Sequence, residues 1–196
     1  MNKLIIITGI SGTGKSTLAK KLYNKIENST LLSFDILTEN IYDIVGFKNK
    51  AEKKSLQQLN ANIYKNLIEE CMKRKDEIII LEKPFKIEWK DYLDQISKKY
   101  KYKILTINLF TNDFDKLFDN LLKREMSKAD RHPSHYLTSY SLKEKELYEP
   151  YFEYEYNTLK QEYDFLESNN INLGKVININ DITELNFDNL IQTISQ

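Results

Sequence analysis

The sequence begins with a run of apolar, β-branched residues that ends in a glycine-rich loop. Residues 5–20 read IIITGISGTGKSTLAK, and this stretch holds three of the five glycines in the chain, Gly9, Gly12 and Gly14. Segment 9–16 satisfies the pattern G-x-x-x-x-G-K-[ST], in which a strand leads through a tight loop into a helix. Such a loop curls around a phosphate with its N–H groups pointing inward, and side chains at the glycine positions would block that approach.

The residues after the glycines favour a nucleoside triphosphate as the ligand. The following helix adds free N–H groups and the positive end of its dipole. Lys15 can reach the β- and γ-phosphates, and the Ser16 hydroxyl can ligate Mg²⁺. An ordinary glycine-rich turn is the alternative, but the strand before it and the helix after it favour a phosphate loop. We therefore predict a site for ATP (or GTP) and Mg²⁺, with the cofactor-binding residues Gly9, Ser11, Gly12, Thr13, Gly14, Lys15, Ser16 and Thr17.

Strand and helix patterns alternate along the whole chain. Short apolar runs predict strands at 4–8, 30–34, 77–81, 103–110 and 175–180. Apolar spacing of three to four residues predicts helices at 15–26, 52–74, 88–99 and near 185–194. A further helix is predicted within 36–50, broken by Gly46, and another follows a cap at Thr111 or Asn112. The last, at 141–167, is predicted to start or kink at Pro150. This alternation predicts an α/β fold with a doubly wound, five-stranded parallel sheet. Because no repeat or linker marks a boundary, residues 1–196 are predicted to form a single domain.

Composition narrows the class of protein. Hydrophobic residues make up 41% and charged residues 30%, which indicates a soluble globular chain. Lys and Arg together equal Asp and Glu in number, so long nucleic acid is a less favoured partner. No apolar run reaches the roughly 18 residues of a membrane span, so no membrane partner is expected. The one cysteine, Cys71, fits a reducing cytosol, and we predict a cytoplasmic protein whose oligomeric state the sequence does not indicate.

Two acidic residues follow predicted strands. The carboxyl ends of parallel strands open on one edge of such a sheet, so Asp35 and Glu82 are expected near the γ-phosphate. Asp35 is predicted to accept the proton of an attacking hydroxyl; the alternative is a cap for the helix at 36–45. Glu82 is predicted to hold Mg²⁺ or to touch the acceptor. Lys83 and Phe85 are candidates for the wall of the substrate pocket.

Arginine is rare in this chain and therefore informative. Of 29 basic residues only Arg74, Arg124 and Arg131 are arginine. Arg124 and Arg131 lie where a helix gives way to a loop, and the planar guanidinium binds a transferring phosphoryl group in a bidentate manner. We predict catalytic roles for both in a lid at about 124–141; the alternative is a pair of surface arginines that end a helix. The tyrosines gathered after this segment are predicted core residues, with stacking on a flat substrate as the alternative.

The motifs together resemble those of a known group of kinases. The loop resembles the Walker A loop of P-loop NTPases, and DRHPSHY at 130–136 is similar to the RHPGH segment of the AAA-type P-loop kinase group. That group includes chloramphenicol phosphotransferase-like, polynucleotide kinase-like and zeta-toxin-like proteins. The resemblance covers about residues 3–140 as ordered landmarks: P-loop, S-x-D, strand-acid-x-P-F and lid. It implies a nucleoside-monophosphate-kinase-like fold with strand order 2-3-1-4-5, a helical lid, and adenine flanked by residues 180–183. The group more often has Asp where this chain has Glu82.

We therefore predict an ATP-dependent kinase that transfers the γ-phosphoryl group of ATP·Mg²⁺ to a hydroxyl of a small molecule. The predicted catalytic residues are Lys15, Asp35, Arg124 and Arg131, and the predicted metal residues are Ser16 and Glu82. One alternative is a kinase of 5′-hydroxyl ends of RNA or DNA, which shares these landmarks. Another is a P-loop ATPase switch that signals to a protein partner and needs no Asp35. No signature in 36–60 or 85–92 identifies the acceptor.

Overall fold

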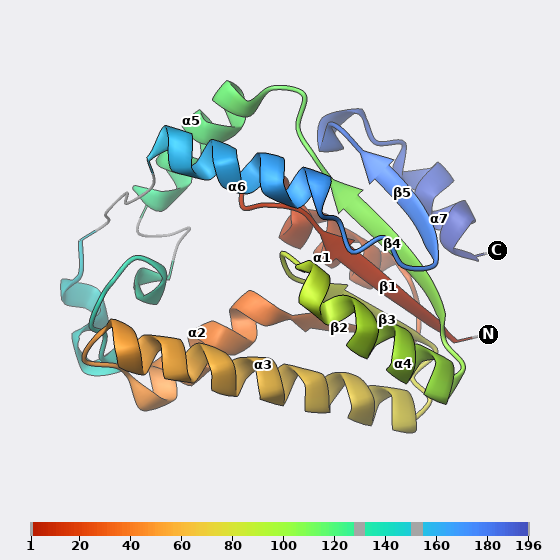
Figure 1. Cartoon of the computed structure of the whole chain (residues 1–196), viewed down its shortest axis with the longest axis horizontal. Helices are drawn as coiled ribbons and strands as arrows, with labels where there is room; N and C mark the ends of the chain where they lie inside the picture. Colours follow the sequence, from red (N-terminus) through yellow and green to blue (C-terminus); the bar gives the residue numbers. More distant parts are fainter. Residues whose placement is uncertain (1, 128–131, 150–154, 196) are drawn as a thin grey trace.

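A computed structural model describes residues 2–127, 132–149 and 155–195 of the chain (Figure 1). Five parallel strands form one sheet in the order β2-β3-β1-β4-β5, which confirms the predicted fold class and strand order. The strands are β1 (Lys3–Thr8), β2 (Ser29–Ser33), β3 (Ile78–Glu82), β4 (Lys103–Leu109) and β5 (Lys175–Ile179). The central strand, β1, is apolar at nearly every position because helices cover both of its faces.

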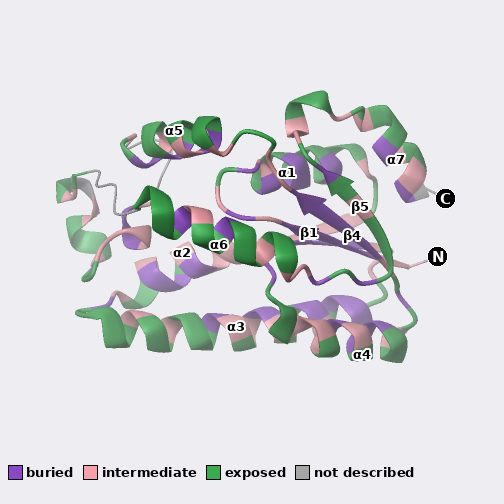
Figure 2. Ribbon diagram, turned by 45° about the horizontal axis from the view of Figure 1, so that its top comes forward, coloured by how far each residue is buried: buried purple, intermediate pink, exposed green. Residues whose placement is uncertain are grey.

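Helices sandwich the sheet. The α-helices are α1 (Lys15–Lys25), α2 (Phe34–Val45), α3 (Lys50–Lys73), α4 (Lys90–Tyr100), α5 (Phe114–Glu125), α6 (Tyr156–Ser168) and α7 (Phe187–Ser195). Helices α3 and α4 pack on the face that carries Leu4 and Ile6, and α1 and α7 pack on the face that carries Ile5 and Ile7. Figure 2 shows the central strand β1 buried between these layers, and the edge strand β5 and the outer surfaces of α3 and α6 largely exposed. None of the helices in the described ranges is long and apolar enough to span a membrane.

Two smaller apolar clusters lie outside the two faces of the sheet. In the first, Ile10 packs with Leu117 and Leu121 of α5 and with Leu159 of α6. In the second, Tyr42 at the end of α2 packs with Phe47 and with Tyr140 of segment 132–149. Main-chain hydrogen bonds in both directions join Phe47 and Tyr140. Segment 132–149, which contains the short helices Pro133–His135 and Leu142–Leu147, therefore docks on α2.

Several local predictions are corrected by the structure. Helix α5 is capped by the Asp113 carboxylate, which accepts from the N–H of Lys116, and not by Thr111 or Asn112. The predicted helix at 141–167 is two elements, Leu142–Leu147 and α6, separated by extended backbone at Tyr148; Pro150 lies outside the described residues.

The apolar spacing in 52–74 predicts that α3 buries Leu56, Leu59, Ile63, Leu67 and Cys71, and the structure confirms this only in part. The buried stripe of this helix contains Asn60, Tyr64 and Ile68, and it leaves the predicted Leu59 and Leu67 exposed. The polar Asn60 faces inward because it donates hydrogen bonds to Thr38 and to the main chain of Phe34.

Candidate functional site

The glycines of the phosphate loop occupy backbone conformations that other residues rarely adopt. Gly9, Gly12 and Gly14 have φ of +144°, +87° and +88°. A Cβ at Gly9 would lie 2.4 Å from the main-chain oxygen of Leu109, and one at Gly14 would lie 2.7 Å from Ile182. The loop therefore needs glycine at these positions to turn between β1 and α1 while α5 and the β5–α7 turn approach it closely.

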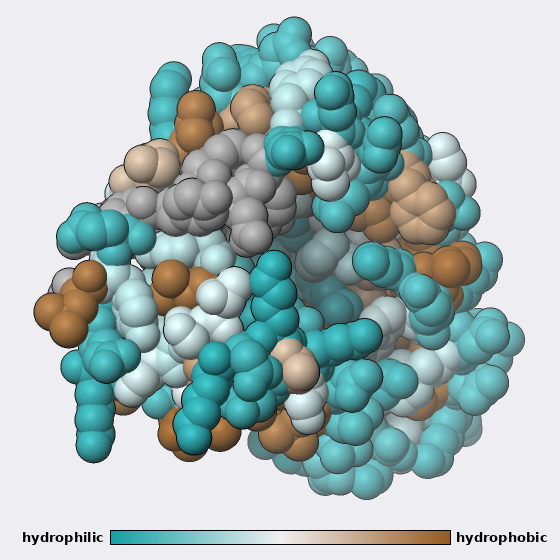
Figure 3. Space-filling model, turned by 60° about the vertical axis from the view of Figure 1, so that its left-hand side comes forward, coloured by the Kyte–Doolittle hydropathy of each residue, from teal (hydrophilic) through white to brown (hydrophobic). Residues whose placement is uncertain are grey.

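A cavity of about 470 Å³ opens beside this loop. All the predicted cofactor-binding residues except Gly9 and Thr13 contribute to its wall. Those two support the loop: Gly9 contacts the end of β4, and the Thr13 hydroxyl donates to the main-chain oxygen of Ile10 at 2.9 Å. Figure 3, a view from the side of segment 132–149, shows a recess among hydrophilic side chains on this face.

Lys15 lies within the loop rather than in solvent. Its side chain is buried, and its Nζ donates a hydrogen bond of 2.7 Å to the main-chain oxygen of Ile10. The predicted reach of Lys15 to the β- and γ-phosphates stays a prediction.

Glu82 connects the end of β3 to the phosphate loop. Its carboxylate accepts one hydrogen bond from the Ser16 hydroxyl at 3.1 Å and a second from the Ser33 hydroxyl at 2.7 Å. The side chain is buried and lines the cavity. The β2–β3 register pairs Ser33 with Glu82, so this contact follows directly from the sheet. Two hydroxyl oxygens and one carboxylate form a set of hard oxygen donors, the kind that Mg²⁺ prefers.

Asp35 lies in the first turn of α2 and lines the same cavity. It does not cap the helix, because α2 starts at Phe34 with Ser33 as the N-cap residue, so the capping alternative is wrong. Among the described residues no hydrogen bond holds its carboxylate. The nearby Lys83 ammonium lies 3.5 Å from the centre of the Phe34 ring. Burial lowers the pKa of Lys83 to about 8, and the negative charge of Asp35 opposes that shift.

Arg124 reaches the cavity from α5. Its Nη2 donates to Oε1 of the buried Glu125 at 2.6 Å, and its Nε is buried without a hydrogen-bond partner in the described part of the chain. A half-buried guanidinium whose Nε–H has no partner there is suited to an anionic ligand. The second predicted arginine, Arg131, lies outside the described residues.

Glu39 is a cavity residue that the sequence interpretation missed. It lies one helical turn after Asp35 on α2, and its Oε1 is 2.7 Å from Nε2 of His135. One turn further, Asp43 lies 3.0 Å from Nε2 of His132 and also accepts from Lys145 and Tyr140. The four-residue spacing of Asp35, Glu39 and Asp43 was the available signal, since residues four apart share one face of a helix.

Other candidates for the substrate wall are partly corrected. Phe85 is a core residue that packs edge-on against Trp89, and its neighbours Pro84 and Lys86 line the second cavity described below. The core prediction for the tyrosines is confirmed in part. Tyr140 and Tyr163 are buried, Tyr136 and Tyr148 are half-buried, and Tyr156 is exposed; Tyr151 and Tyr154 lie outside the described residues. Ile182 in the 180–183 turn lies against Gly14, so this turn borders the phosphate loop; its predicted contact with adenine stays a prediction.

Comparison with known proteins agrees with this architecture. Over its full length the chain resembles the crystal structure of a "putative kinase" from Chloroflexus aurantiacus, with a TM-score of 0.76 at 17% identity and 97% of that chain covered. It also resembles a tunicamycin resistance protein from Deinococcus radiodurans, with a TM-score of 0.59 at 11% identity, 100% of this chain and 94% of that one being covered. No curated protein matches the sequence significantly. The model of the family described as "AAA domain" matches residues 4–139, which include the phosphate loop, Asp35, Glu82 and Arg124, and the chain therefore belongs to this family.

Proposed function

We propose that this protein is an ATP-dependent kinase that phosphorylates a hydroxyl group of a small molecule. The observation that carries the proposal is the position of Asp35, whose carboxylate lines the same cavity as the phosphate loop and is held by no hydrogen bond among the described residues. A carboxylate in that position is available to an incoming hydroxyl. An ATPase that only hydrolyses nucleotide and signals to a partner has no need of it.

The proposed reaction gives roles to Asp35, Lys15 and Arg124 of the cavity. The acceptor oxygen bonds to the γ-phosphorus while the bond from that phosphorus to the β–γ bridging oxygen breaks, and ADP leaves. The hydroxyl proton passes to the Asp35 carboxylate. Lys15 and the loop N–H groups bind the phosphates, and the free Nε–H of Arg124 donates to the transferring phosphoryl group. Arg131 is proposed to assist Arg124.

The oxygen donors at the end of β3 fit Mg²⁺. Ser16 and Glu82 would hold the ion together with the nucleotide phosphates, with the Ser33 hydroxyl orienting the Glu82 carboxylate. A bound Mg²⁺ neutralises charge on the β- and γ-phosphates. The longer side chain of glutamate, compared with the aspartate more usual in this group, still reaches the Ser16 hydroxyl from β3.

The fold likeness supports phosphotransfer, and the charge balance supports a small acceptor. The Chloroflexus aurantiacus structure with the same fold is named as a putative kinase, which favours phosphotransfer over a switch. The net charge of the chain is zero, and an oligonucleotide substrate would need several basic contacts along its backbone. We therefore favour a small alcohol over a 5′-hydroxyl end.

The direct test is transfer of labelled γ-phosphate to a panel of acceptors. The panel contains sugars, nucleosides, vitamins, aminoglycosides, apolar alcohols and a 5′-hydroxyl oligonucleotide. Wild type is compared with Asp35→Asn and with Asp91→Asn, a matched control because Asp91 lies in the first turn of α4 and is exposed. Asp35→Asn should lower single-turnover transfer by about 10²-fold at unchanged nucleotide affinity, because asparagine cannot take the proton.

Two outcomes would contradict the proposal. Transfer by Asp35→Asn within about threefold of wild type would remove Asp35 from the mechanism. Steady ATP hydrolysis with no labelled product from any acceptor would favour the ATPase switch. If the oligonucleotide is the best acceptor and its affinity falls steeply with salt, with a slope near −0.7 per phosphate contact, the 5′-end kinase replaces the small-molecule kinase.

A further inference from the structure

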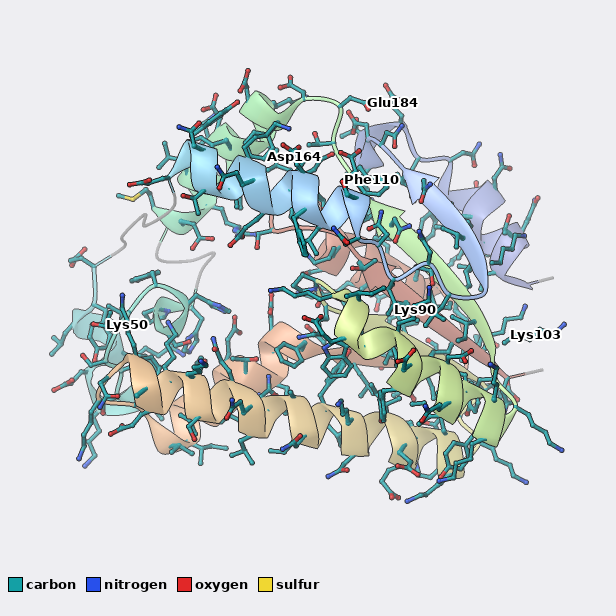
Figure 4. All side chains as sticks on the ribbon, viewed as in Figure 1. Lys50, Lys90, Lys103, Phe110, Asp164 and Glu184 are labelled. Carbon is teal, nitrogen blue, oxygen red and sulfur yellow. The ribbon has the colours of Figure 1, made fainter. Side chains whose placement is uncertain are left out.

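A second cavity of about 480 Å³ adjoins the phosphate loop at Ile10 and Ser11. Ile10 and Ser11 of the loop form one end, Pro84 after β3 forms the floor, and α6 forms the opposite wall. Figure 1 shows α6 crossing above the α3 and α4 layer, and Figure 4 shows side chains from both sides projecting into the space between them. This volume is in the range that holds one small organic molecule.

The two cavities meet at the phosphate loop, since Ser11 lines both. They differ in chemistry. The first is lined by charged and hydroxyl groups such as Lys15, Glu82 and Arg124, which suit phosphates and a cation. The second is lined mainly by apolar groups. A molecule in the second cavity would therefore lie next to the loop without competing for its phosphate-binding groups.

One face of α6, which carries both polar and apolar side chains, forms the opposite wall. Thr158, Gln161, Glu162 and Phe165 follow the three- and four-residue spacing of a single helical face, and Leu159 and Leu166 flank it. Phe165 is 55% exposed, whereas Leu159 and Tyr163 of the same helix are buried in the core. An aromatic ring left open on the wall of a cavity offers a stacking surface to a ligand.

The polar groups of this cavity set the charge of its ligand. Lys86 stands on the floor loop and Glu162 on α6, so the wall carries one charge of each sign. Neither sign dominates, which favours an uncharged molecule. Thr158 and Gln161 add groups that hydrogen-bond to hydroxyls.

We propose that this second cavity binds the phosphoryl acceptor, and that the acceptor is an uncharged alcohol carried on an apolar, ring-containing body. The inference rests on the proposed kinase function and adds the substrate class to it. The ring stacks on Phe165 between α6 and Pro84, and the hydroxyl points past Ser11 to the γ-phosphate. There its oxygen bonds to the γ-phosphorus as ADP departs, and its proton goes to Asp35.

The test uses ring-bearing alcohols of increasing length, from 2-phenylethanol to 4-phenyl-1-butanol, with 2-cyclohexylethanol, and compares them with glycerol and ribose. Binding is measured by saturation-transfer NMR, which needs no turnover, and transfer by labelled ATP. Two variants probe the wall: Phe165→Ala removes the ring, and Thr158→Trp fills the cavity from an exposed position. Tyr23→Ala is the matched control, because Tyr23 is a 46% exposed aromatic residue of α1 that lines neither cavity.

The ring-bearing alcohols should bind and accept phosphate with a higher kcat/KM than glycerol or ribose. Phe165→Ala and Thr158→Trp should each raise their KM on the order of tenfold, as expected for loss of one buried aromatic contact, at unchanged KM for ATP. Tyr23→Ala should match wild type.

The remaining outcomes separate this inference from the kinase proposal. Phosphorylation of glycerol, ribose or another polar acceptor, without binding of any ring-bearing alcohol, would overturn the inference and leave the kinase proposal intact. Binding that depends on Phe165, without transfer to any acceptor, would support the assignment of the cavity and contradict the kinase. Absence of binding at up to millimolar concentrations of every ring-bearing alcohol would overturn the inference in either case.

Discussion

The hydroxyl of Ser16, in the first turn of α1, donates a hydrogen bond of 3.1 Å to the carboxylate of Glu82, the last residue of β3. The contact brings the hydroxyl of the phosphate loop to a buried carboxylate that a second hydroxyl, from Ser33, also holds. The Mg²⁺ ligand set proposed above depends on this pair.

Glu82→Gln should therefore raise the Mg²⁺ concentration needed for half-maximal phosphotransfer. Glutamine keeps the size of the side chain but removes the negative charge, and we expect a turnover loss of about tenfold or more at 1 mM Mg²⁺ that higher Mg²⁺ partly restores. A Mg²⁺ titration of transfer measures this. Glu88→Gln, at an exposed position after β3, is the control. Identical Mg²⁺ curves for Glu82→Gln and wild type would limit Glu82 to a structural role.

Arg124→Lys should reduce turnover far more than it reduces nucleotide affinity. Lysine keeps the charge but loses the planar set of donors, including the buried Nε–H that has no partner in the described residues. Arginines that contact a transferring phosphoryl group contribute about 10³–10⁵ in rate, so a loss of at least about tenfold is expected. Single-turnover transfer and nucleotide titration are compared with Arg74→Lys, whose arginine makes an exposed ion pair with Asp76. A loss of turnover below about twofold would indicate that Arg124 does not contact the transferring phosphoryl group.

Stability should depend on pH through His132. Burial lowers the pKa of this imidazole, Lys145 adds to the effect, and Asp43 and Glu39 oppose it. The fold therefore favours neutral His132, whose contribution is complete above the ordinary pKa of 6.5 and is lost as the pH falls through the lower folded value.

Asp43 titrates in a lower pH range than His132. Burial alone would raise its pKa, but hydrogen bonds from Tyr140 and Lys145 outweigh burial and lower it from 3.8. The stability advantage of wild type over His132→Asn, measured by urea unfolding, should consequently shrink between pH 7 and pH 5. An advantage that grows on acidification would mean that the Asp43 pairing favours the imidazolium.

Gly9→Ala should destabilise the fold as well as the site. The residue has φ of +144°, and a Cβ would lie 2.4 Å from the main-chain oxygen of Leu109, which β4 holds in place. A strained residue of this kind costs about 1–3 kcal/mol, which urea unfolding resolves. Ser11→Ala, in the same loop, is the control and should stay within about 0.5 kcal/mol of wild type. Equal stability of the two variants would show that β4 yields to the methyl group.

The elements that the sequence predicted best are those whose burial is complete. Strands β1 and β3 are continuous apolar runs because both of their faces are covered, and the phosphate loop has a motif that only one backbone path satisfies. The face of α3 was harder to predict. Its inward Asn60 and Tyr64 satisfy polar atoms on other elements, Thr38 and the main-chain oxygen of Leu32, and apolar spacing alone carries no sign of such partners.

The site shows the same division between local and long-range information. Asp35 and Glu82 could be placed from topology, because parallel strands end on one edge. The partners of Glu39 and Asp43 could not, since His135 and His132 are more than 85 residues away along the chain and reach α2 only through the docking of segment 132–149. The wall that α6 adds to the second cavity could not be predicted either, since it faces the phosphate loop and Pro84, which are more than 70 residues away along the chain.

Because the three carboxylates of α2 are spaced four residues apart, the contacts that they make depend on the number of residues between them. Asp35 faces the cavity, while Glu39 and Asp43 hold the two histidines of segment 132–149. Each added or deleted residue turns the rest of a helix by about 100°. A single insertion after Asp35 would keep every side chain but rotate Glu39 and Asp43 about the helix axis, away from His135 and His132. Such an insertion would break both carboxylate–histidine contacts between α2 and segment 132–149 without any substitution at the site.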